Sequence, residues 1–305
     1  MKTYIPLLFF AAFCWGCQKT VEISSERLDK IPYTSVEKNQ EKNFYLYIPK
    51  GYDSDEMKDW PVIMFLHGNG ERGNGKEDLG FTMAHGPIYE AWVQRRDLPF
   101  IIIGPQLPLY GFDTLGIPYL TNRDITKFPV RLEDGTPPRS PKGESNQLMN
   151  GQPALSSYSY GTEGPPMGWN TIEQDLLNIL DKVKTEYRVD HSRIYLSGLS
   201  YGGFGTWYLA SKHPDIFAAI NPIVGWGHED LMEALAEAEM PIWCFAGGRD
   251  GAVNVQYFYR GMNRLEELGH KNVRFTVEED MGHDVWKRVY AGEDIYNWFL
   301  KHKKE

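Results

Sequence analysis

RIYLSGLSYG, residues 193–202, joins an apolar run to a Gly-x-Ser-x-Gly turn and thereby decides the fold of this chain. The apolar run predicts a strand, and a helix is expected to begin at Tyr201. A serine at the tip of such a strand–turn–helix is held in strained backbone geometry, with its hydroxyl exposed above the sheet. Glycine is expected on both sides because a Cβ there would collide with the neighbouring strand or helix. The pattern therefore indicates Ser200 as a nucleophile and the Tyr201 amide as a donor to an oxyanion.

A serine hydroxyl is a weak nucleophile that needs a base, and the base needs an acid to orient it. The chain places Asp250 shortly after the apolar run at 241–246 and His283 after another at 273–277. Both runs predict strands, so both side chains are expected in loops at the carboxyl ends of strands. We expect His283 to take the proton of Ser200 and return it to the leaving group. Asp250 would hold the useful imidazole tautomer and stabilise its cation.

Other interpretations of these residues remain open. Asp230 follows the preceding strand and competes for the role of the acid, whereas Asp280 and Asp284 are too close to His283 in sequence to orient it easily. Asp250 could be a plain turn former, because Asp-Gly is a common turn pair. The remaining histidines fall in ordinary contexts, and no His/Cys spacing typical of a metal site occurs, so no metal is expected.

A glycine-rich loop follows a second decisive strand. WPVIMFL, residues 60–66, shows no alternation and predicts a strand that is buried on both faces. It runs into HGNGERG, residues 67–73, where glycines let the backbone approach a ligand and turn its amides inward. We expect the amide of Asn69, with Gly70 beside it, to complete the oxyanion hole with Tyr201. The alternative is a plain glycine-rich loop; a phosphate loop is excluded because no Gly-Lys-Ser/Thr follows.

Strands and helices are expected to alternate along the chain, which predicts the α/β class. Expected strands are 43–48, 60–66, 100–103, 193–197, 218–224, 241–246 and 273–277, and expected helices include 172–187, 201–213, 229–238, 254–268 and 284–302. This order predicts a mostly parallel central sheet with helices on both faces. Ligands bind such sheets at the carboxyl ends of the strands, where the candidate residues fall.

These motifs together resemble the α/β-hydrolase superfamily, and most of all its esterase and predicted-peptidase branch. That branch includes phospholipase/carboxylesterase-like and feruloyl-esterase-like proteins. The resemblance is carried by residues 67–73, 187–190, 193–207 and 282–286, and it covers about residues 40–105 and 168–302. It implies the α/β-hydrolase fold, the chain order nucleophile, acid, histidine, and an acyl-enzyme on the serine. It does not define the substrate.

A long insertion, residues 106–168, follows the fourth strand of this fold. It is dense in proline, glycine and aromatic residues and shows little periodicity. Segments of this kind are unusual inside compact domains and tend to be functional or disordered. We expect it to form a lid or substrate wall, with a disordered or merely packed excursion as the alternative. The whole hydrolase domain is expected over residues 39–305.

The N-terminus predicts export. Lys2 followed by a short apolar stretch is typical of a signal peptide, expected over residues 1–17. Cys17 after Gly16 resembles a bacterial lipoprotein cleavage site, so a lipid on Cys17 is expected to be the sole membrane contact. Ordinary cleavage before Cys17 is the alternative. Residues 18–38 would form a tether, and the protein would be periplasmic or displayed at the cell surface.

Composition agrees with one large α/β domain. The 305 residues are 42% hydrophobic, enough for a sizeable core, and Cys244 is expected to be buried in a strand. A net charge of −9 argues against a nucleic-acid partner. The expected function is cofactor-independent hydrolysis of carboxylic esters, either small molecules or acyl and feruloyl esters on polysaccharides. The alternatives are a serine peptidase of the same fold and a catalytically silent surface binding lipoprotein.

Overall fold

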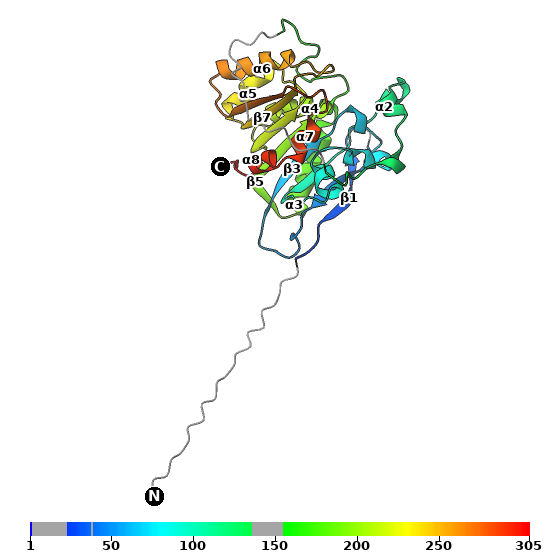
Figure 1. Ribbon diagram of the computed structural model, residues 1–305, viewed down its shortest axis with the longest axis vertical. Helices are drawn as coiled ribbons and strands as arrows, with labels where there is room; N and C mark the ends of the chain where they lie inside the picture. Colours follow the sequence, from blue (N-terminus) through cyan, green and yellow to red (C-terminus); the bar gives the residue numbers. More distant parts are fainter. Residues whose placement is uncertain (2–22, 38, 136–154) are drawn as a thin grey trace.

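A computed structural model describes residues 1, 23–37, 39–135 and 155–305 (Figure 1). Its centre is an eight-stranded sheet in the order β1-β2-β4-β3-β5-β6-β7-β8. The strands are β1 (Arg27–Ser35), β2 (Gln40–Ile48), β3 (Trp60–Leu66), β4 (Ile101–Gly104), β5 (Val189–Leu199), β6 (Ala219–Ile223), β7 (Ile242–Gly247) and β8 (Val273–Glu278). From β4 to β8 neighbouring strands are parallel, whereas β2 is antiparallel to both β1 and β4. The predicted mostly parallel sheet is confirmed.

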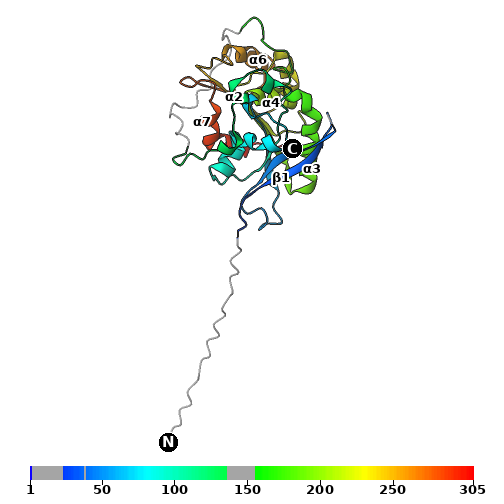
Figure 2. The same cartoon turned by 90° about the vertical axis from the view of Figure 1, so that its right-hand side faces the viewer.

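Helices cover both faces of this sheet. They are α1 (Gly86–Ile88), α2 (Pro118–Thr121), α3 (Glu173–Glu186), α4 (Tyr201–Lys212), α5 (Met232–Glu237), α6 (Gln256–Glu267), α7 (Trp286–Ala291) and α8 (Asp294–Phe299). Helices α3 to α6 pack on one face and α7 and α8 on the other, and Figure 2 shows α3 and α7 on opposite sides of the molecule. None of the helices within the described ranges is long and apolar enough to cross a bilayer.

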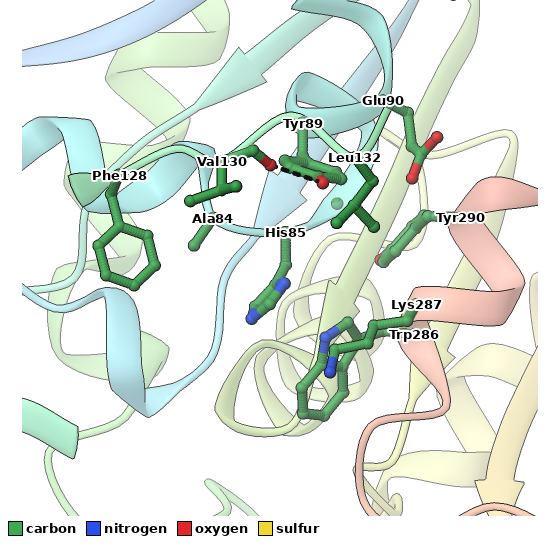
Figure 3. Close-up of a pocket in the computed structure, with 11 residues that line it drawn as sticks. Ala84, His85, Tyr89, Glu90, Phe128, Val130, Leu132, Trp286, Lys287 and Tyr290 are labelled. Atoms are coloured by element: carbon green, nitrogen blue, oxygen red, sulfur yellow. Dashed lines mark hydrogen bonds between the residues drawn. The ribbon is translucent and has the colours of Figure 1, made fainter. Parts of the chain in front are cut away.

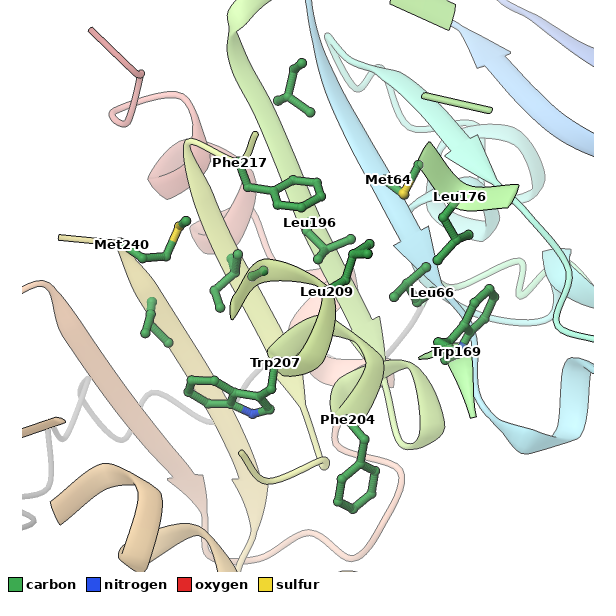
Figure 4. Close-up of a cluster of buried hydrophobic side chains, with 14 of the residues drawn as sticks. Met64, Leu66, Trp169, Leu176, Leu196, Phe204, Trp207, Leu209, Phe217 and Met240 are labelled. Atoms are coloured by element: carbon green, nitrogen blue, oxygen red, sulfur yellow. The ribbon is translucent and has the colours of Figure 1, made fainter. Parts of the chain in front are cut away.

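The position of β3 between two layers of helices explains why its sequence does not alternate between apolar and polar residues. Met64 and Leu66 point into the core beneath α3 and α4 (Figure 4), whereas Ile63 and Phe65 point into the core beneath α7 and α8. Successive strand residues face opposite sides of a sheet, so a strand with helices on both sides is apolar at every position.

The tether expected over residues 18–38 is wrong for residues 27–35, which form the edge strand β1. Within this segment Ile31 and Tyr33 face the core, and exposed residues alternate with them. The charged and proline residues suit an edge strand, where one row of backbone groups faces water. The Ser35 hydroxyl donates to Asp175 of α3 at 2.6 Å and fixes the end of the strand.

Two further differences concern the C-terminal helix and the insertion. The helix expected over 284–302 is divided into α7 and α8, because Gly292 adopts an extended conformation between them. The described parts of the insertion, 106–135 and 155–168, carry α2 and short 3₁₀ turns. The signal peptide and Cys17 lie outside the described residues.

Candidate active site

Ser200 occupies the turn between β5 and α4 in a conformation that only a rigid surrounding structure maintains. Its backbone has φ 51° and ψ −116°, and a positive φ in a residue other than glycine costs about 1–3 kcal/mol. Its amide donates to the carbonyl of Ile223 in β6 at 2.9 Å, and its own carbonyl accepts from Phe204 of α4 at 3.1 Å. The sheet and the helix therefore both hold the strained residue in place.

The two glycines of the turn allow strand and helix to meet. A Cβ on Gly198 would lie 2.2 Å from the carbonyl oxygen of Gly202, and a Cβ on Gly202 would lie 1.8 Å from that of Leu66 in β3. Neither position has room for a side chain, as expected from the sequence.

The structure brings Ser200, His283 and Asp250 into one chain of hydrogen bonds. The Ser200 hydroxyl lies 2.9 Å from Nε2 of His283, and Nδ1 of His283 lies 2.7 Å from Oδ2 of Asp250. Asp250 follows β7 and His283 follows β8, so all three residues stand at the carboxyl ends of parallel strands. With Nδ1–H donating to Asp250, Nε2 is free to accept the serine proton.

Asp250 is suited to hold that tautomer. Its carboxylate is fully buried, and its other oxygen accepts from the amides of Ala252 and Val253 at 2.8 and 2.9 Å. Burial alone would raise the pKa of Asp250, but hydrogen bonds from His283 and these amides outweigh it and lower the pKa below its usual value. The carboxylate therefore stays ionised beside the imidazole.

The other acids considered for this position have basic partners elsewhere. Asp280 binds Arg288 at 2.8 Å, Asp284 binds Lys287 at 3.1 Å, and Asp230 lies 3.3 Å from His228. The geometry thus places Asp250, and none of these three, against His283.

Asn69 and Tyr201 line the same cavity as Ser200 and His283, which has a volume of about 440 Å³. Tyr201 is the first residue of α4, where backbone amides have no acceptor within the helix. The Asn69 side chain is engaged elsewhere: its Nδ2 donates to the Tyr119 hydroxyl at 2.9 Å and its Oδ1 accepts from Arg72. This leaves the backbone amide of Asn69 as the group available to an oxyanion.

Arg72 is a residue of the site that the sequence pattern did not single out. Its side chain is buried, and it donates to Asn69, to the Pro108 carbonyl at 2.7 Å and to the Met167 carbonyl at 2.8 Å. It also lies over the ring of Tyr201 at 4.8 Å. Burial lowers the pKa of Arg72 to about 10, so it remains charged at neutral pH. Arg72 thereby ties the loop after β3 to both ends of the insertion.

His67, although next to the site, has a structural role. Its Nδ1 donates to the Gly68 carbonyl at 2.6 Å, and its Nε2 accepts from the Leu107 amide at 3.0 Å. Burial lowers the pKa of His67 to about 3, so the ring is neutral at ordinary pH. Both nitrogens are thus committed to the backbone of the two loops that frame the cavity.

Glu71 is a second polar group that the sequence did not single out. It lines the cavity with His85, whose Nε2 lies 3.8 Å from Glu71 Oε1. A Cβ on Gly68 would lie 3.2 Å from Glu71 Oε2 and 3.6 Å from the Cβ of Ser200, so the carboxyl group and the nucleophile both lie close to Gly68. Burial raises the pKa of Glu71 to about 7, an effect that the amides of Gly68 and Glu71 partly offset. Oε2 has no hydrogen-bond partner among the described residues.

Within the described part of the chain, no three His, Cys, Asp or Glu side chains gather closely enough to hold a metal ion. Cys244 is fully buried in β7, as predicted, and burial raises the pKa of its thiol well above the usual value. It therefore serves as a small apolar core residue.

Comparison with known proteins agrees with this architecture. A sequence model of the prolyl oligopeptidase family matches residues 167–228, which include Ser200. A bifunctional acetylxylan esterase/xylanase from Neocallimastix patriciarum is 35% identical over 133 residues. These residues are 41% of this chain and 19% of the relative, so the chain spans only a small part of that protein.

Solved esterases share the fold over most of the chain. A thermostable esterase has a TM-score of 0.59 at 24% identity, over 91% of this chain and 63% of its own. The feruloyl esterase module from Clostridium thermocellum has a TM-score of 0.54 at 17% identity, over 91% of this chain and 88% of its own. The chain has the α/β-hydrolase fold, and the fold prediction is confirmed. Esterases and a peptidase family are among the proteins that it resembles.

Proposed function

We propose that this protein is a serine hydrolase that cleaves carboxylic esters through an acyl-enzyme. The observation that carries the proposal is the hydrogen-bonded chain from Ser200 through His283 to Asp250, at the wall of a cavity that Asn69 and Tyr201 also line. A nucleophile, an oriented base and amide donors in one cavity are the parts that acyl transfer needs.

In the proposed reaction the Ser200 oxygen attacks the ester carbonyl carbon while its proton passes to Nε2 of His283. The carbonyl oxygen becomes an oxyanion, and the amides of Asn69 and Tyr201 stabilise it. The bond to the leaving oxygen then breaks, and His283 protonates that oxygen as the alcohol departs. A water molecule attacks the acyl-enzyme with the same base, which releases the acid and restores Ser200. Asp250 stabilises the imidazolium in both halves.

The substrate class is a finer part of the proposal. An acetylxylan esterase and a feruloyl esterase are among the similar proteins, which supports acyl esters, feruloyl esters included, as substrates. The cavity wall contributes the aromatic side chains of Tyr119, Tyr160 and Trp286, which suit a substrate with a flat or apolar part.

A serine peptidase is the second candidate, because the match to the prolyl oligopeptidase family covers the segment around Ser200. The same three side chains can attack an amide carbonyl, with His283 protonating the departing amine. The fold therefore does not separate the two reactions.

Labelling with a fluorophosphonate and a substrate panel test the proposal. Wild-type protein should react covalently with the label, Ser200→Ala should not, and alkyl esters should be hydrolysed in preference to N-acyl dipeptides. Faster cleavage of the peptides would favour the peptidase. Absence of labelling in folded wild-type protein would overturn the enzymatic proposal in favour of a silent binding protein.

A further inference from the structure

A second cavity adjoins the catalytic one. Its volume is about 410 Å³, and we call it the outer pocket; Figure 3 shows the residues that line it. Its apolar wall consists of Ala84, Tyr89, Phe128, Val130, Leu132 and Tyr290. Ala84 and Tyr89 flank α1, and Tyr290 belongs to α7. The other three residues belong to the insertion.

His85 and Trp286 line both cavities and form their common wall. The Trp286 ring stands edge-to-face against the His283 ring, with 5.2 Å between centroids, and lies 5.5 Å from the His85 ring. Trp286 therefore contacts the proposed catalytic base directly and borders the outer pocket. A substrate that extends from Ser200 into the outer pocket would have to pass these two rings.

Four polar groups in the wall of the outer pocket already have protein partners, and Nε1 of Trp286 is buried without a hydrogen-bond partner among the described residues. The Tyr89 hydroxyl donates to the Val130 carbonyl at 2.9 Å, the Tyr290 hydroxyl lies 2.8 Å from the Ser197 hydroxyl, Glu90 binds Arg96 at 3.0 Å, and Lys287 binds Asp284 at 3.1 Å. The surface left for a ligand is accordingly mostly apolar, and much of it consists of aromatic rings.

The insertion adds exposed apolar side chains at this place. Phe128, Val130 and Leu132 are 42%, 59% and 43% exposed, and all three line the outer pocket. A single stretch of the insertion thus supplies all three side chains to one cavity. Large apolar side chains gathered at a cavity mouth mark a binding site, because a ligand that covers them removes apolar surface from water.

We propose that the outer pocket binds the alcohol part of the ester, and that this alcohol carries an aromatic or other flat apolar group. The inference rests on the proposed ester hydrolysis. The leaving oxygen must come within hydrogen-bond reach of Nε2 of His283, so the alcohol lies on the side of Ser200 that His283 and Trp286 occupy. A sugar alcohol suits the outer pocket poorly, because its hydroxyl groups would lose water and face a mostly apolar wall.

Two isomeric esters test which part of the substrate the outer pocket holds. In 2-(2-naphthyl)ethyl acetate the ring belongs to the alcohol, and in ethyl 2-(2-naphthyl)acetate it belongs to the acid. Ethyl acetate is the reference, since its leaving alcohol is of similar reactivity. For wild-type protein, kcat/KM for the alcohol-side naphthyl ester should exceed that for ethyl acetate by about tenfold or more, as expected for burial of a large apolar group.

Ala84→Phe should fill the outer pocket and lower this ratio by about tenfold, and Leu132→Ser should lower it by removing part of the apolar wall. Matched controls, Ala238→Phe and Leu115→Ser, alter exposed residues that line neither cavity and should leave the ratio within about twofold. An unchanged ratio in folded Ala84→Phe and Leu132→Ser, or a loss confined to the acid-side naphthyl ester, would overturn the proposal.

Binding of the product alcohol separates failure of this inference from failure of the proposed function. Calorimetry with 2-(2-naphthyl)ethanol on the Ser200→Ala variant needs no turnover. Adding Ala84→Phe should weaken the affinity by about tenfold, whereas adding Ala238→Phe should not. If wild-type protein hydrolyses none of the esters, the proposed function fails, whether or not the alcohol binds. If esters are hydrolysed but the alcohol does not bind, the outer pocket is not the alcohol site.

Discussion

Ser200 joins two properties at a single residue: a backbone held at positive φ and a hydroxyl aimed at the His283 ring. Hydrogen bonds from the backbone maintain the conformation, and the side chain adds little packing. Its removal should therefore separate reactivity from folding.

Ser200→Ala should lower kcat for ester hydrolysis by about 10⁴ to 10⁶, the usual loss when a nucleophile of this kind is removed. The unfolding midpoint should stay close to that of wild type, because the hydrogen bond that the hydroxyl makes within the described part of the chain is to the part-buried His283. Steady-state kinetics and denaturant unfolding on the same preparations measure both. An alanine variant that keeps more than about a tenth of the wild-type rate would show that Ser200 is not the nucleophile.

The Asp250→Asn variant tests whether Asp250 is the acid that orients His283. An asparagine amide that replaces Oδ2 would donate to Nδ1, and the imidazole would then carry its proton on Nε2, where it cannot accept from Ser200. We expect a loss in kcat of about 10⁴. Asp230→Asn, at the rival position beside His228, should retain the wild-type rate within a few-fold. The opposite ranking of the two variants would move the acid to the loop after β6.

Glu71 makes stability depend on pH. Its pKa is about 7 in the folded chain because of burial, against an ordinary value of 4.5, so between these values the folded state binds more protons than the unfolded state. The free energy of unfolding therefore falls as pH rises through this window, by an amount on the order of 3 kcal/mol. In the Glu71→Gln variant the free energy of unfolding should no longer show this decrease with rising pH.

Denaturant unfolding at pH 5 and pH 8 checks this prediction. The stability of Glu71→Gln relative to wild type should be greater at pH 8 than at pH 5, since His67 and His85 remain in both proteins. Glu237→Gln, an exposed position on α5, is the control and should show no such trend. A pH-independent difference between Glu71→Gln and wild type would contradict the raised pKa.

Parallel strands supply the geometry at the scale of elements. The loops after β3, β5, β7 and β8 all leave the same edge of the sheet, and each delivers one part of the candidate site. The sequence sufficed for these parts because local patterns encode them: apolar strands buried on both faces, glycines where a Cβ has no room, and a helix start after Ser200. Such patterns depend on near neighbours in the chain.

The parts that the sequence did not predict depend on distant contacts. Strand β1 is polar and contains a proline, so only its pairing with β2 distinguishes it from a tether. The helix expected over 284–302 shows apolar periodicity throughout, and the extended Gly292 between α7 and α8 interrupts it. Arg72 acts through acceptors at Pro108 and Met167, which are remote in sequence. No short sequence pattern predicts an arginine that binds acceptors so distant along the chain.

Arg72→Met tests the link between the loop after β3 and the insertion. Without the guanidinium, Asn69 Oδ1 and two backbone carbonyls lose their donor, which should reduce stability by about 3 kcal/mol or more. The Asn69 amide should also shift, and a displacement of about 1 Å in such a position costs roughly 10² in rate. We expect the loss in kcat with KM nearly unchanged, measured on ethyl acetate.

Arg264→Met, on the exposed side of α6, is the matched control and should change neither quantity appreciably. Arg72→Lys should recover only part of the activity, because an ammonium group cannot reproduce the planar set of donors. A destabilised Arg72→Met variant with the wild-type kcat would limit Arg72 to a structural role.

At the scale of the whole molecule, the first strand determines how far the domain could stand from a membrane. We propose that the protein is exported and anchored by a lipid on Cys17. Strand β1 begins at Arg27, so nine residues would separate the lipidated cysteine from the sheet. A fully extended chain of nine residues spans at most about 30 Å. An anchored domain would therefore remain next to the bilayer, within reach of substrates that gather at the membrane surface.

Expression of the full chain in a bacterial host tests the anchor. Wild-type protein should fractionate with membranes and be released by detergent but not by high salt, because acyl chains hold it by apolar burial and not by charge. Cys17→Ser should be soluble after export or remain as unprocessed precursor. Cys244→Ser, which alters the buried cysteine of β7, is the control and should leave the membrane fraction unchanged in whatever protein folds. Mass spectrometry of the mature N-terminus decides between the two modes of processing: acylated Cys17 supports the anchor, and an unmodified Cys17 would replace it with ordinary secretion.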